Sequence, residues 1–226
     1  EYLRRFIDIE YFLPDPNYNN YIKYLCENLN FKGFFFGNNR NMPSSAYSFF
    51  DEFIRILASS KKLTLRQMQK LLISVRLVYC SLYTNSEELP GLILLLLYIR
   101  SYHFELYESI VNHQLSCQEL VDELECILPF SLYERKKYSE YHAPVILFPF
   151  CDLLVYYMTT DRNSGESKLW EVDANDFNKI NLFFTTKHLK ADDIARYAKL
   201  IRRTSQLKLS YVTQFIDLEE NLHIED

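Results

Sequence analysis

Two helix-start signals constrain the fold of this sequence more than any other feature. Thr64 and Ser116 are each followed three residues later by Gln67 or Glu119, which is the pattern of a capping box. Apolar residues then recur at helical spacing. After the capping box at Thr64 they are Met68, Leu71, Leu72, Val75, Val78 and Leu82. These signals predict two helices that each bury one face.

Further helices are predicted on either side of this pair. Asn17 can cap a helix that begins at Tyr18, a second helix follows Pro43, and Pro90 can open a third that carries the apolar run 92–99. Residues 31–42 hold two of the four glycines and are predicted as a loop. Asp51 and Glu52 are interpreted as acids at the N-terminal end of a helix.

The start of the chain has a different pattern. Ile7, Ile9 and Tyr11 alternate with acidic residues, which is typical of a half-buried strand that ends before Pro14. No comparably clear strand follows before residue 140, and a strand needs partners for its backbone hydrogen bonds. We therefore expect it to be the last strand of a sheet whose other strands lie upstream of this chain.

Residues 144–158 are apolar but interrupted by Pro149, so their pattern does not separate helix from strand. Helical spacing returns near Ile194. The predicted fold class is mainly α, a helical bundle with one N-terminal strand and room for a small irregular or β element within 143–172.

A family resemblance rests on two stretches that occur in the right order. Residues 2–14, Tyr-Leu-Arg-Arg-Phe-Ile-Asp-Ile-Glu-Tyr-Phe-Leu-Pro, resemble the segment that closes the nucleotide-binding sheet in the KAP family of P-loop NTPases. Leu-Thr-Leu-Arg-Gln at 63–67, the run 92–100 and Leu106-Tyr107 are similar to a second stretch of that family. The resemblance covers roughly the first half of the chain.

The resemblance implies a domain plan and a function. Residues 1–16 would end a nucleotide-binding core, 17–130 would form a helical lid-like domain, and 131–226 a C-terminal helical or mixed extension. Its partner would be the upstream P-loop domain of the same protein, with ATP and magnesium bound there and a further protein partner or self-association. Family members are intracellular ATPases tied to phage exclusion or defence in bacteria and to membrane-associated signalling in animals.

The 226-residue sequence contains no catalytic motif of its own. None of its four glycines is followed by Lys-Ser or Lys-Thr, and no G-x-x-x-x-G-K occurs. We therefore expect no nucleotide hydrolysis and no cofactor binding by this chain alone. The alternative to the lid is a free-standing, all-helical protein–protein interaction module.

Arg66 is the candidate nucleotide sensor. It falls at the second position of the helix capped by Thr64, where its charge opposes the helix dipole by about 0.3–1 kcal/mol. A guanidinium at a helix N-terminus suits an anion, and the resemblance implies that it reaches the γ-phosphate from a lid helix. The alternative is a surface arginine paired with an acidic neighbour.

Other site chemistries find less support. His113 and Cys117 are four residues apart, but Ser116 caps a new helix between them and no second pair completes a metal site. The net charge of −5 argues against nucleic acid as the main ligand, although basic clusters occur at 135–137 and 202–203. Five widely spaced cysteines predict a reducing, cytoplasmic environment. The run 92–99 is too short to span a membrane.

Overall fold

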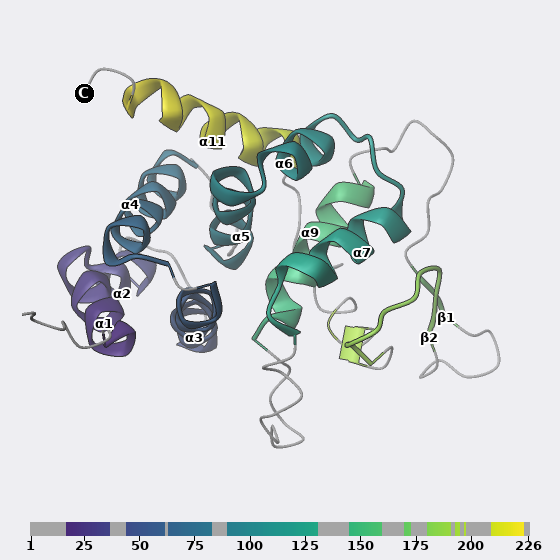
Figure 1. Ribbon diagram of the computed structural model, residues 1–226, viewed down its shortest axis with the longest axis horizontal. Helices are drawn as coiled ribbons and strands as arrows, with labels where there is room; N and C mark the ends of the chain where they lie inside the picture. The colour runs from purple at the N-terminus through teal and green to yellow at the C-terminus, as the bar shows by residue number, and fades with distance from the viewer. Residues whose placement is uncertain are drawn as a thin grey trace, which may run out of the picture.

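The computed structural model describes residues 17–36, 44–61, 63–82, 90–130, 145–159, 170–172, 180–190, 193–194, 197 and 209–223. The described part of the chain is mainly helical, as the sequence predicts (Figure 1). Its helices are α1 Tyr18–Asn28, α2 Phe31–Phe36, α3 Ser44–Lys61, α4 Leu65–Ser81, α5 Pro90–Tyr102, α6 Phe104–Val111, α7 Cys117–Ile127, α9 Leu147–Thr159 and α11 Leu209–His223. The predicted strand near the N-terminus lies outside the described residues.

Helix α5 is the centre of the fold. Every residue from Leu92 to Ile99 is buried, because a helix that is apolar on all sides must be covered on all sides. It packs against α3, α4, α6, α9 and α11. In Figure 1, α1 to α4 lie on one side of it, α7 and α9 lie on the other, and α11 runs across the top. The predicted buried run is thus confirmed as the core.

The helix starts follow the local signals. Asn17 accepts a hydrogen bond from the Asn20 amide and caps α1, and both predicted capping boxes are formed. Pro90 is the first residue of α5, where its missing N–H leaves no helical bond unmade. All six apolar residues predicted for the core side of this helix are buried, namely Met68, Leu71, Leu72, Val75 and Val78 in α4 and Leu82 at its C-cap.

The prediction of a loop is wrong for its first half, because residues 31–36 form α2. Asn30 adopts a left-handed conformation with φ 49° and reverses the chain after α1. Its side chain then accepts a hydrogen bond from the Gly33 amide, which caps the new helix. A Cβ at Gly33 would lie 2.4 Å from Asn30 Oδ1, so a larger residue there would displace the capping side chain. The rest of the predicted loop lies outside the described residues.

The element predicted within 143–172 is part helix and part strand. Residues 147–159 are α9, which accommodates Pro149 in its first turn, where proline removes no helical hydrogen bond. Strand β1 (Trp170–Val172) pairs antiparallel with β2 (Ile180–Leu182), with Glu171 opposite Asn181. The small β element therefore exists, but its second strand lies beyond the predicted range.

The interpretation of Asp51 and Glu52 as helix N-terminal acids is also wrong. Helix α3 begins at Ser44, so both residues lie in its interior. Asp51 instead pairs with Arg55 one turn later on the same helix.

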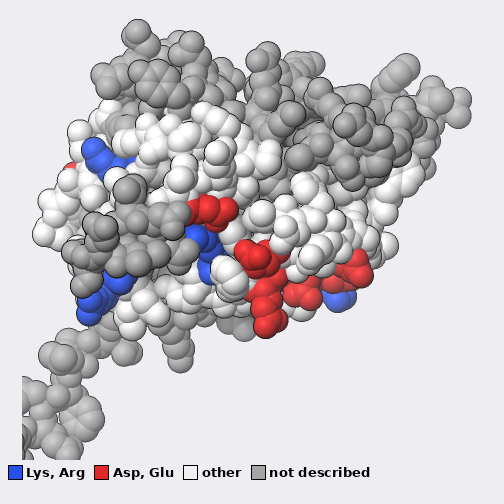
Figure 2. Space-filling model, turned by 90° about the horizontal axis from the view of Figure 1, so that it is seen from above, with Lys and Arg blue, Asp and Glu red and all other residues white. Residues whose placement is uncertain are grey.

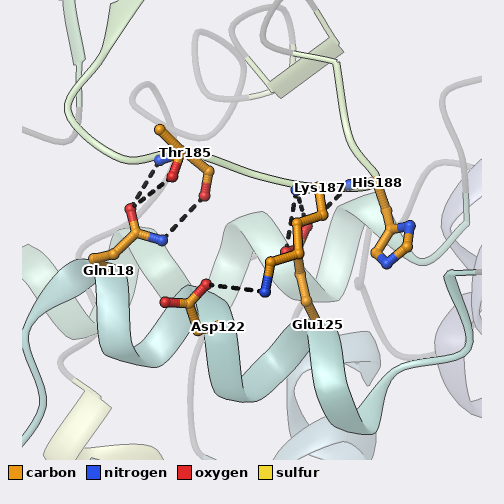
Figure 3. A network of polar contacts seen from close by, with 6 residues as sticks. All are labelled: Gln118, Asp122, Glu125, Thr185, Lys187 and His188. Atoms are coloured by element: carbon orange, nitrogen blue, oxygen red, sulfur yellow. Dashed lines mark hydrogen bonds and ion pairs between the residues drawn. The ribbon is translucent and has the colours of Figure 1, made fainter.

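The chain after β2 is attached to α7 by side chains of that helix (Figure 3). Gln118 accepts from the Thr185 amide at 2.9 Å and donates to its carbonyl at 3.2 Å. Glu125, only 8% exposed, accepts hydrogen bonds from the backbone amides of Lys187 and His188. These contacts hold residues 185–188, which belong to no helix or strand, against α7.

Candidate functional site

The N-terminal end of α4 has a well-defined geometry. Thr64 Oγ1 accepts from the Gln67 amide at 3.2 Å, and Gln67 Oε1 accepts from the Thr64 amide at 2.8 Å. Leu63 and Met68, on either side of this box, are buried and anchor the helix end to the core. The cap leaves the amides of Leu65 and Arg66 without an intrahelical acceptor, since the first turn has none to offer.

Arg66 is exposed at the second position of this helix. Within the described part of the chain, no hydrogen bond or ion pair reaches its guanidinium, so the acidic neighbour of the alternative interpretation is not found there. The guanidinium and the two first-turn amides are donors at the same helix end. Together they can offer an anion a positive, hydrogen-bonding surface.

The charges on the helices also favour an anion at α4. Helix α4 contains Arg66, Lys70 and Arg76 and no acidic residue. Helices α6 and α7 contain only acidic charged residues. Figure 2, which views the molecule from the side of α11, shows acidic side chains toward the right of this face and basic ones mostly toward the left. Among α4, α6 and α7, positive and negative groups thus lie on different helices.

A second candidate is a cavity of about 460 Å³ between α1, α2 and α3. It is lined from α1 by Lys23, Cys26 and Glu27, and from α3 by Tyr47 and the Asp51–Arg55 pair. Arg66 is not among its lining residues. Tyr21 of α1 donates to Gln69 of α4 at 3.5 Å, whereas Lys23, Cys26 and Glu27 lie on other faces of α1. The cavity and the α4 end are therefore separate candidates.

Arg55 organises one wall of this cavity. Its Nε and NH2 donate to the two carboxylate oxygens of Asp51 at 2.8 and 2.9 Å. Its NH1 donates to the Asn19 carbonyl of α1 at 2.8 Å, so the same guanidinium joins α1 and α3. This bidentate geometry neutralises Asp51 and leaves little free charge on the wall.

Two uncharged groups, Cys26 and Tyr47, also line the cavity. Burial raises the pKa of the Cys26 thiol to about 12, and Asp51 adds to the effect. Burial likewise raises the pKa of the Tyr47 phenol to about 12, with Cys26 and Asp51 adding to it. Both groups are protonated at neutral pH and carry no charge that would repel an anion.

His113 and Cys117, which the sequence does not support as a metal site, have other neighbours. The ring of His113 stacks on Tyr157, with ring centroids 4.7 Å apart, and Tyr157 holds the Leu115 backbone through its hydroxyl. Burial raises the pKa of the Cys117 thiol to about 11. In the described ranges, His, Cys, Asp and Glu form no group of three or more that could hold a metal ion.

Sequence reasoning missed the cavity altogether. Its residues come from three helices, and the only local signal was the i, i+4 spacing of Asp51 and Arg55. Among the described residues, no helix is both long and apolar enough to cross a membrane. No protein-family model, curated protein or solved structure matches the chain.

Proposed function

We propose that this chain is the helical region of a KAP-like P-loop ATPase and couples the nucleotide state of an upstream domain to a partner protein. The observation that carries the proposal is the exposed Arg66 at the capped N-terminus of α4, which no described acidic residue pairs. A cation at this position opposes the helix dipole, so it reduces stability unless an anion is bound nearby. The resemblance of residues 2–14 and of the stretch around Arg66 to the KAP family supplies the identity of that anion.

In this proposal Arg66 reads the γ-phosphate. ATP and magnesium would be held by the upstream P-loop domain, and the helical region would close over them. The guanidinium and the amides of Leu65 and Arg66 would then donate to the terminal phosphate, which ADP lacks. Helix α4 packs on α5 and α11, so its movement would be transmitted to the rest of the bundle.

The test uses the protein extended upstream through its P-loop. We expect Arg66→Ala to lower kcat/KM for ATP roughly 10- to 100-fold, because a hydrogen bond to a charged group contributes about 1.5–3 kcal/mol. ATP should also lose its advantage over ADP in binding. Arg66→Lys keeps the charge but loses the planar fork, and we expect it to restore only part of the activity.

Lys70→Ala is the matched control, since Lys70 is an exposed cation one turn further along the same helix. It changes the net charge by the same amount and should leave kcat/KM within about twofold, as isolated surface charges contribute little. Equal losses in both variants would reduce the role of Arg66 to a general electrostatic one. The absence of an upstream P-loop, or an Arg66→Ala enzyme with full activity, would instead favour the free-standing interaction module.

A further inference from the structure

The cavity between α1, α2 and α3 has a net positive charge once its internal pair is set aside. Asp51 and Arg55 neutralise each other through two hydrogen bonds of 2.8 and 2.9 Å. Lys23 on α1 and Lys32 on α2 also line the cavity, and both are exposed. Among the described residues that line the cavity, Glu27 supplies the one remaining negative charge. Among the described lining residues, two lysines on different helices therefore stand against a single carboxylate that the Asp51–Arg55 pair does not involve.

These ammonium groups are not held by partners within the described residues. Lys23 and Glu27 are spaced for a helical ion pair, yet no contact of 4 Å or less joins them. Lys32 likewise has no hydrogen bond or ion pair there. Both side chains can turn toward a ligand without first breaking an interaction.

The size of the cavity restricts the ligand further. Its volume of about 460 Å³ lies in the range of roughly 300–1,000 Å³ typical of small-molecule sites. A bare inorganic ion would leave most of this space unfilled. Tyr47 and Cys26, both uncharged at neutral pH, offer a wall for an organic body.

We propose that this cavity binds a small organic phosphomonoester, with Lys23 and Lys32 on its phosphate and Tyr47 beside its organic part. A phosphomonoester carries close to two negative charges at neutral pH and so can satisfy both ammonium groups at once. A monocarboxylate has a single charge and two acceptor oxygens, so it offers the two lysines fewer hydrogen bonds than the three oxygens of a phosphate do. Lysine binds phosphate as a point charge and tolerates the flexible geometry of two different helices. The site lies apart from Arg66, so the inference does not depend on the proposed ATPase.

The experiment titrates the full 226-residue chain with phenyl phosphate and follows amide shifts by NMR. We expect saturable binding, with the shifts concentrated in α1, α2 and α3. The double variant Lys23→Gln/Lys32→Gln should weaken binding by about tenfold, given the modest strength of exposed ion pairs. Lys70→Gln removes an exposed lysine of α4 and should leave binding within about twofold. Circular dichroism of each variant shows whether the helices are retained.

Each of three results would overturn the inference. Inorganic phosphate that binds as tightly as phenyl phosphate would indicate an adventitious ion only. Benzoate or succinate binding as tightly would show that the site does not select a phosphomonoester. Loss of binding in Arg66→Ala but not in the double lysine variant would place the phosphate at α4 and refute the cavity site.

Discussion

The buried carboxylate of Glu125 is expected to be a main anchor of the segment after β2. It accepts three hydrogen-bond contacts, from the Lys187 amide at 2.9 and 3.1 Å and from the His188 amide at 3.2 Å (Figure 3). Glu125→Ala removes the acceptor and leaves two backbone donors near the protein interior without it. Each hydrogen bond to a charged group contributes about 1.5–3 kcal/mol, and the freed amides regain part of this from water. We therefore expect a loss of roughly 2–4 kcal/mol in the free energy of unfolding.

Urea denaturation of both proteins gives the size of this loss, and hydrogen exchange shows where it arises. The amides of Lys187 and His188 should lose protection in Glu125→Ala, while those of α5 should retain most of theirs. Glu125→Gln keeps one carbonyl acceptor of the same shape and should have an intermediate effect. Glu123 is exposed on the same helix, so Glu123→Ala is the control and should change stability by about 0.5 kcal/mol or less.

Two results would refute this reasoning. A Glu125→Ala protein as stable as the Glu123→Ala control would show that the carboxylate is not an anchor. Unchanged exchange at residues 187 and 188, with stability lost elsewhere, would show that the effect comes from α7 itself.

Three further predictions concern α4, α11 and the buried titratable groups. Thr64→Ala should lower the free energy of unfolding by about 1 kcal/mol in urea denaturation, and Thr64→Ser should have little effect, because only the alanine loses the cap. Tyr107→Phe should lower it by roughly 1–2 kcal/mol, because the Tyr107 hydroxyl donates to Asp217 at 2.9 Å and ties α6 to α11. An equal loss in an Asp217→Ala background, which lacks the acceptor, would contradict that link. Burial raises the pKa of the Cys117 and Cys26 thiols from 9.0 to about 11 and about 12 respectively. The unfolded chain therefore releases these protons at lower pH than the folded one, and the free energy of unfolding should fall as pH rises from about 9. Urea midpoints, measured in reductant, that stay constant from pH 9 to 11 would contradict this.

The elements that the sequence predicts well are those specified by neighbouring residues. The capping boxes at Thr64 and Ser116 and the proline start at Pro90 involve contacts within one helical turn, and the structure contains all three. The apolar run 92–99 is similarly self-sufficient, because its composition alone requires burial. These signals are enough to establish a mainly helical fold.

The errors occur where a distant or unusual contact decides. Residues 31–36 looked like a loop because Gly33 disfavours a helix, but the left-handed Asn30 and its side chain start one there. Glu125 binds the amides of Lys187 and His188, which lie 62 and 63 positions further along the sequence, and no periodic pattern reveals such a contact. The cavity residues come from three helices, so it could be recognised only after these were packed together.

The charge distribution restricts how the helical region could face a nucleotide. A polyphosphate is repelled by the exposed carboxylates of α6 and α7, where Glu105, Glu108, Glu119 and Glu123 have no basic residue on the same helices. Helix α4 has only cations, and its exposed N-terminal end adds the positive end of the helix dipole. Of these three helices, α4 is therefore the one that a P-loop domain with bound ATP could face favourably. In the proposed ATPase, Arg66 would act from the helix whose charge favours a nucleotide, whereas a sensor on α6 or α7 would act against the local field.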